Sequence, residues 1–108
     1  MKVDELVKKT GFTALVLPSP EKEVTGGYTG DMPSWVMGHG KPGDAWITIM
    51  NNKNIVAVAT LLDFSCIVVT DGSVIPENVL KLAKDEDVNI LTSKKTAFEV
   101  SKEIADLL

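Results

Sequence analysis

Residues 45–70, AWITIMNNKNIVAVATLLDFSCIVVT, decide the fold class of this 108-residue chain. Residues 45–50 and 64–70 are short, apolar and rich in β-branched side chains, which is typical of buried strands. Residues 55–62 between them are apolar on nearly every side, and their alanines favour a helix over a third strand. A strand, a helix and a strand make a crossover unit, which needs at least about 10–12 connecting residues. The stretch therefore predicts two parallel strands joined by a helix.

The segments that follow continue this alternation. Pro76 stands where a helix would begin, and residues 88–91 (VNIL) indicate a short strand. Thr96 and Glu99 have the spacing of a capping box, which predicts the start of a C-terminal amphipathic helix. From residue 45 onward, alternating strands and helices predict a parallel sheet with right-handed crossovers.

The N-terminal part predicts a helix followed by strands. Residues 3–7 carry one apolar stripe, and Gly11 is suited to end this helix. Residues 12–17 (FTALVL) predict a buried strand, and residues 21–24 a brief second strand. Together the patterns predict one domain over residues 1–108, a small three-layer α/β domain with a mostly parallel sheet of about four to five strands.

Residues 24–44, VTGGYTGDMPSWVMGHGKPGD, are the candidate functional stretch. They hold six of the eight glycines, the only tyrosine and the only histidine. Within them Asp31 is predicted to cap a helix of about two turns that Gly38 and Gly40 end. Trp35 and His39, four residues apart, would share one face of that helix.

We expect the backbone over residues 26–31 to form one wall of a ligand pocket, because glycine lets a ligand approach the main chain closely. A second part of the site would be the turn after residues 64–70, since parallel sheets bind ligands beyond the carboxyl ends of their strands. The predicted ligand-binding residues are Gly26, Gly27, Tyr28, Thr29, Gly30, Asp31, His39, Asp71 and Gly72. The alternative is that the glycines form only a tight turn packed under Trp35.

The glycine stretch contains neither common nucleotide motif. No Gly-Lys-Ser/Thr follows the glycines, and position 25 is threonine where a dinucleotide fingerprint needs glycine. Asp31, His39 and Asp44 could ligate a metal, but three spaced ligands without a repeat are a weak signal. The sequence therefore predicts no catalytic residue, no metal and no cofactor. Cys66, among apolar neighbours, is predicted to be a core residue.

The composition argues against two classes of binding partner, nucleic acids and membranes. A net charge of -4 argues against nucleic acid, whose phosphates need a basic face. No apolar run reaches the roughly 18 residues of a membrane span, so no membrane partner is expected. The N-terminus is charged and amphipathic, unlike a secretory signal, and a single cysteine forms no internal disulfide. These features predict a cytoplasmic protein.

The order of five segments resembles the DRTGG domain, in particular its small stand-alone subfamily. The segments are TGGYTGD (25–31), WITIMNNKNIVAVA (46–59), IVVTDG (67–72), Pro76 and KKTAFEV (94–100). That family is similar to the N-terminal domain of HPr kinase/phosphorylase and also occurs beside CBS domains in regulated family II pyrophosphatases. The chain departs from it at Asn52-Lys53, where Asp-Arg is expected, and at Asp71, where glycine is expected.

The resemblance implies an α/β fold and a regulatory, often dimeric role. We therefore expect a non-catalytic domain that binds a small ligand or a signalling protein. Its setting would be redox or hydrogenase-linked signalling, or carbon metabolism. The strongly apolar helix over residues 55–62 supports a homodimer, because a helix apolar all round must be covered on both sides. The alternatives are a phosphotransfer enzyme related to HPr kinase, and a ligand-free dimerisation or adaptor module.

Overall fold

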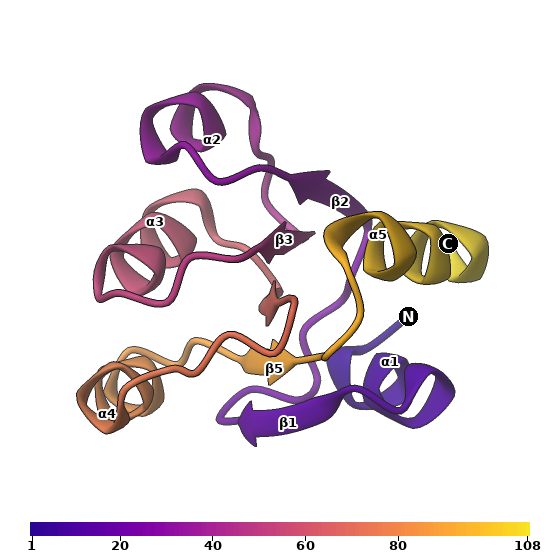
Figure 1. The fold of residues 1–108 in the computed structure, drawn as a ribbon, viewed down its shortest axis with the longest axis horizontal. Coiled ribbons are helices and arrows are strands. Elements are labelled where there is room, and N and C mark those ends of the chain that lie inside the picture. Colours follow the sequence, from indigo (N-terminus) through magenta and orange to yellow (C-terminus); the bar gives the residue numbers. More distant parts are fainter.

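A five-stranded sheet lies between two layers of helices in the computed structural model, which describes residues 1–108 (Figure 1). The strands are β1 (Thr13–Val16), β2 (Gly26–Thr29), β3 (Asp44–Thr48), β4 (Cys66–Val69) and β5 (Ile90–Thr92). The helices are α1 (Val3–Thr10), α2 (Pro33–His39), α3 (Asn54–Leu62), α4 (Glu77–Asp85) and α5 (Ala97–Leu107). The predicted three-layer α/β fold with a mostly parallel sheet is confirmed.

The strand order is β1-β5-β4-β3-β2, and only β1 runs antiparallel to its neighbour. Helices α2, α3 and α4 cover one face of the sheet, and α1 and α5 cover the other (Figure 1). Because both faces are covered, every residue of β3 and β4 is buried. The crossover predicted from residues 45–70 is present: α3 connects the parallel strands β3 and β4, with Ala45 opposite Cys66.

Two sheet predictions in the N-terminal part are wrong. The strand over residues 12–17 was expected to be buried, but β1 is an edge strand whose first three residues are exposed. An apolar run cannot report which edge of the sheet it will occupy, because that is decided by the other strands. The second wrong prediction is the strand over residues 21–24. In the structure, Glu23 makes only an isolated bridge with Lys2.

The helix ends follow the local signals at both termini of the chain. Gly11 ends α1 with a φ of 75°, the left-handed conformation that glycine adopts readily. The predicted capping box begins α5: the Glu99 N–H donates to Thr96 Oγ1 (3.2 Å) and the Thr96 N–H donates to Glu99 Oε1 (3.1 Å). Glu99 Oε1 also accepts from the Thr96 hydroxyl (3.1 Å), and the two hydrogen bonds that it accepts, first from the Thr96 N–H and second from this hydroxyl, lower the pKa of the Glu99 carboxyl. None of the helices has both the length and the apolar character that crossing a membrane requires.

Candidate functional site

The glycine stretch forms a strand rather than the loop we expected. β2 is the edge strand opposite β1 and pairs in parallel with β3, with Gly26 opposite Asp44 and Tyr28 opposite Trp46. Glycine disfavours strands, so the sequence predicted no strand over these residues. Pairing with a fully buried neighbouring strand overrides that local preference.

Only some of the glycines are required by the fold. A Cβ at Gly26 would lie 2.8 Å from Asp44 Oδ1, so the carboxylate occupies the place of a side chain. A Cβ at Gly27 would make ordinary contacts, the nearest at 3.5 Å from the Ala45 carbonyl. Gly27 does not have positive φ, whereas Gly43 has a φ of 86°. Gly27 is therefore not needed for the backbone conformation, but with no side chain it leaves the surface of β2 uncovered at this position.

Helix α2 follows β2 and carries the aromatic side chains of the stretch. Pro33 occupies its first turn as expected, and Gly40 ends it, but Gly38 lies within it. The Trp35 and His39 rings are stacked, with centroids 4.4 Å apart and planes 19° apart, which confirms their shared face. His39 Nδ1 lies 2.9 Å from the Trp35 carbonyl, which can only accept. Nδ1 therefore carries a proton and donates this hydrogen bond.

Asp31 is not the predicted cap of α2. Met32 occupies that position and makes no side-chain capping hydrogen bond. Instead Asp31 Oδ1 accepts hydrogen bonds from the Thr48 hydroxyl (2.8 Å) and the Ile49 N–H (3.0 Å), at the end of β3. The carboxylate therefore fixes the carboxyl ends of β2 and β3 to one another.

Two hollows lie along β2, and Tyr28 lines both. The first, of about 440 Å³, is here called the Gly26 hollow; it is lined by Thr25, Gly26, Gly27, Tyr28, His39, Lys41, Pro42 and Asp44. The second, of about 470 Å³, is called the Trp35 hollow; it is lined by Tyr28, Thr29, Gly30, Asp31, Met32, Trp35 and Val36. Tyr28 is half-buried and packs against the core on the α2 side of the sheet. Seven of the nine predicted ligand-binding residues thus line two adjacent hollows.

The two hollows differ in chemistry. In the Gly26 hollow, three polar residues lie around the start of β2: Thr25, His39 and Lys41. Asp44 there is buried, and its Oδ2 accepts from the Lys41 N–H (2.9 Å). In the Trp35 hollow, the Trp35 ring is 58% exposed and the Met32 side chain 63% exposed, which leaves a soft apolar surface open to solvent.

Asp71 and Gly72 lie apart from the other predicted residues. They form a turn after β4 in which both have positive φ, 59° and 66°. The Asp71 N–H donates to the Lys95 carbonyl and the Gly72 N–H to the Ser93 carbonyl, so the turn is tied to the chain after β5. Gly72 lines a different hollow of about 330 Å³, near β1 and β5. The structure does not join this turn to the hollows along β2.

The possible metal ligands are not assembled. No group of three or more His, Cys, Asp or Glu side chains is placed to hold a metal ion, and Asp31 and His39 line different hollows. Cys66 is fully buried in β4, as its apolar neighbours predicted, and burial raises the pKa of its thiol to about 12. A thiol in that state is neither a nucleophile nor a metal ligand at neutral pH.

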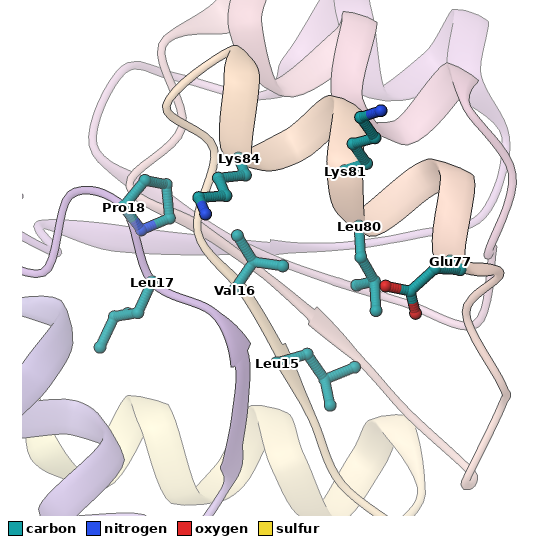
Figure 2. A pocket seen from close by; sticks show the side chains of 8 residues that line it. All are labelled: Leu15, Val16, Leu17, Pro18, Glu77, Leu80, Lys81 and Lys84. Atoms are coloured by element: carbon teal, nitrogen blue, oxygen red, sulfur yellow. The ribbon is translucent and has the colours of Figure 1, made fainter.

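Sequence reasoning missed the largest hollow of the molecule. It has a volume of about 570 Å³ and lies between β1 and α4 (Figure 2). Its lining residues are Leu15, Val16, Leu17, Pro18, Glu77, Leu80, Lys81 and Lys84. The sequence signal for this hollow was that Lys81 and Lys84 share one side of α4 with Leu80, away from the buried residues Val79 and Ala83. Without knowing that β1 is an edge strand, that signal could not be interpreted.

The family comparison matches most of the chain. The family model described as the DRTGG domain matches residues 29–107. The match begins at the last residue of β2 and runs through α5, so it contains every residue of the Trp35 hollow except Tyr28 and most of the sheet. No protein with a curated description matches the sequence.

One similar solved structure is a crystal structure of the CBS and DRTGG domains of the regulatory region of Clostridium perfringens pyrophosphatase. That protein was crystallised in complex with its activator, diadenosine tetraphosphate. It superposes with a TM-score of 0.75 and 20% sequence identity, over 99% of this chain and 47% of that chain. The chain therefore spans about half the length of that structure, and the likeness between the two is one of fold.

Proposed function

The chain belongs to the DRTGG domain family, and on that premise we propose that residues 1–108 act as one non-catalytic regulatory domain that binds a small ligand along β2. The observation that carries this proposal is the pair of hollows that share Tyr28. An edge strand leaves main-chain N–H and C=O groups without a strand partner, and glycines keep them accessible. Concave sites with a few convergent polar groups are the usual form of small-molecule sites.

The two hollows suit the two halves of one ligand. The stacked Trp35–His39 pair and the Tyr28 ring offer aromatic surface for a planar group. The Lys41 ammonium and the His39 ring offer polar contacts to hydroxyl or anionic groups. A nucleoside or mononucleotide combines both parts. The carboxylates of Asp31 and Asp44 on the two sides disfavour a highly charged polyphosphate.

The activator of the pyrophosphatase supports the aromatic half of this ligand, because diadenosine tetraphosphate contains adenine rings; its tetraphosphate is the part that Asp31 and Asp44 would disfavour here. A regulatory role also fits the lack of catalytic machinery: the chain has no phosphate-binding loop motif and no assembled metal ligands. We propose that the domain acts in signalling linked to redox, hydrogenase or carbon metabolism. Incubation with labelled ATP and an HPr protein is expected to transfer no phosphate.

The test is a binding titration of the full chain with adenosine, AMP, ATP and diadenosine tetraphosphate, followed by amide chemical shifts. We expect shift changes at β2 and α2, and binding weakened about tenfold or more by Tyr28→Ala. Phe98→Ala removes an aromatic ring that is 78% exposed on α5 and lines neither hollow, so it is the matched control. Shift changes confined to other elements, or no binding by any of the four compounds, would refute the proposal.

We also propose that the domain forms a homodimer through the outer side of α3. Ala57, Thr60 and Leu61 are exposed there, and Leu61 is 70% exposed. Together with Leu82 of α4 they line an apolar hollow of about 360 Å³. Apolar surface of this kind is stabilised when a partner excludes water from it. The same surface also supports the adaptor alternative, in which dimerisation is the whole function.

A further inference from the structure

β1 is an open edge of the sheet. It pairs with β5 on one side and has no strand on the other, and Thr13, Ala14 and Leu15 are exposed. The N–H and C=O groups of an open edge can pair with another extended chain. A register shift between Ala14 and Val16, and Pro18 beyond them, limit this template to the four residues of β1.

The hollow of about 570 Å³ lies directly beside this edge. Its apolar part is formed by Leu15 and Val16 of β1 and by Leu80 of α4 (Figure 2). Leu15 is 38% exposed, so the apolar part is open to a side chain from outside. In an added strand, alternate side chains would point into this hollow, at intervals of about 6.5–7 Å along the strand.

The charged groups of the hollow are two lysines and one glutamate, all from α4. Figure 2 shows the Lys84 side chain reaching from α4 toward Val16 and Pro18, while Lys81 extends away from β1. Neither lysine belongs to any of the ion pairs of the structure. Lys84 is therefore the cation that faces β1, on a chain whose net charge is -4, whereas the Glu77 carboxylate lies beside Leu80 (Figure 2). A negatively charged partner group beside Lys84 is therefore favoured over a positive one.

We propose that β1 and α4 form a docking site for an extended acidic segment of a partner protein, added to the sheet as a strand. The segment would place an apolar side chain against Leu15 and Leu80. An aspartate or glutamate two positions away in the segment would then face Lys84. Main-chain hydrogen bonds to β1 would give affinity, and these two side-chain positions would give specificity. This site lies at the opposite edge of the sheet from β2, so it is separate from the proposed ligand site.

The experiment uses the full chain and a capped octapeptide, Val-Thr-Glu-Thr repeated twice, which places valine and glutamate two positions apart on one face of a strand. Binding is followed by fluorescence polarisation and amide shifts. We expect saturable binding, with shift changes at β1 and the facing side of α4. An otherwise identical peptide with lysine in place of each glutamate is expected to bind at least about tenfold more weakly. A peptide with proline in place of each threonine keeps the valine and glutamate side chains but loses four N–H donors, and it is also expected to bind at least about tenfold more weakly.

Lys84→Glu is expected to weaken binding of the glutamate peptide by about tenfold or more. Lys8→Glu makes the same charge change on an exposed residue of α1 outside the hollow, and is expected to change binding less than about twofold. Equal binding of the glutamate and lysine peptides, or no binding of either, would overturn the proposal. So would concentration-dependent shifts at β1 without peptide, because they would assign the edge to a second copy of the chain.

Discussion

Replacing Gly43 with alanine tests which glycines of the central stretch are required by the backbone. Gly43 has a φ of 86°, and a Cβ there would collide with the Thr25 hydroxyl. The backbone cannot move aside easily: the Gly43 N–H donates to the Asp63 carbonyl and its own carbonyl accepts from the Thr25 N–H, both at 3.0 Å. Both the conformation and the space at this position therefore exclude a side chain.

The magnitude follows from two costs and one gain. A left-handed conformation costs a non-glycine residue about 1–2 kcal/mol. Forcing a methyl group against a fixed neighbour adds about 1–3 kcal/mol, and the lower entropy of the unfolded alanine chain offsets about 0.4–1 kcal/mol. We expect Gly43→Ala to lower the free energy of unfolding by about 1–4.5 kcal/mol, with about 3 kcal/mol at the middle of these ranges. For a domain of this size the middle value corresponds to a melting temperature lower by about 10–15 °C.

Gly27→Ala is the matched control, because it makes the same change within the same stretch. Gly27 lacks positive φ, and its Cβ would lie 3.5 Å from the Ala45 carbonyl and 3.7 Å from Ile47 Cδ1. We expect its free energy of unfolding to change by less than about 1 kcal/mol. Urea unfolding followed by circular dichroism measures both variants. If the two variants have the same stability within about 0.5 kcal/mol, the steric reasoning at Gly43 is wrong.

Four further predictions concern buried or exposed side chains. Asp31→Ala should lower the free energy of unfolding by about 1–3 kcal/mol, because the buried Thr48 hydroxyl loses its acceptor; urea unfolding measures this. Asn89→Ala should lower the free energy of unfolding by about 2–4 kcal/mol in the same assay, since the buried Asn89 side chain makes three hydrogen bonds. A decrease below about 1 kcal/mol would show that these hydrogen bonds do not stabilise the fold. Cys66 should be inert to a thiol reagent at pH 8 in the folded protein. The pKa of the Cys66 thiol is 9.0 in the unfolded chain and about 12 in the folded protein, so between these pH values the unfolded chain binds fewer protons than the folded protein. The free energy of unfolding should therefore fall as the pH rises from 9.0 to about 12, and it should fall less steeply in Cys66→Ala. Leu61→Asp should convert a dimer to a monomer in light scattering at micromolar concentration, and a wild-type monomer there would count against dimerisation through α3.

The sequence predicted the centre of the fold because the information there is local. Residues 45–70 contain two apolar strand segments separated by an alanine-containing helix. This pattern alone predicts strands that are buried on both faces of a sheet, as β3 and β4 are. The capping box at Thr96 and the stop at Gly11 are likewise encoded within four residues. Each of these features is present in the structure.

The predictions that failed depend on contacts between distant residues. Asp31 lies one residue before the cap position of α2, and its carboxylate accepts hydrogen bonds from Thr48 and Ile49, 17 and 18 residues away. Gly26 is part of a strand because it pairs with Asp44 of β3, and the Asp44 carboxylate lies where a side chain at position 26 would be. No pattern within residues 24–31 records either partner. Local propensity was overridden by tertiary contacts in both cases.

Asn89 shows the same limit in the core. It lies just before β5 in a segment predicted to be an ordinary strand, yet its side chain joins Ser19 to Ser65 through buried hydrogen bonds. Ser19 belongs to the connection that leaves β1, and Ser65 comes just before β4. A buried asparagine can be recognised from sequence only when its partners are known, because the side chain is usually exposed.

The two edges of the sheet place the proposed ligand site and the proposed partner site far apart in the strand order. Between β2 and β1 lie β3, β4 and β5, whose side chains are almost entirely buried and closely packed. Coupling between two sites requires an element with two alternative arrangements that both sites bias. A packed parallel sheet offers no such element, whereas the exposed Met32 and Trp35 on α2 lie at the ligand hollow itself. A ligand along β2 would therefore act mainly by changing the surface of α2, and we expect peptide affinity at β1 to be the same with and without it.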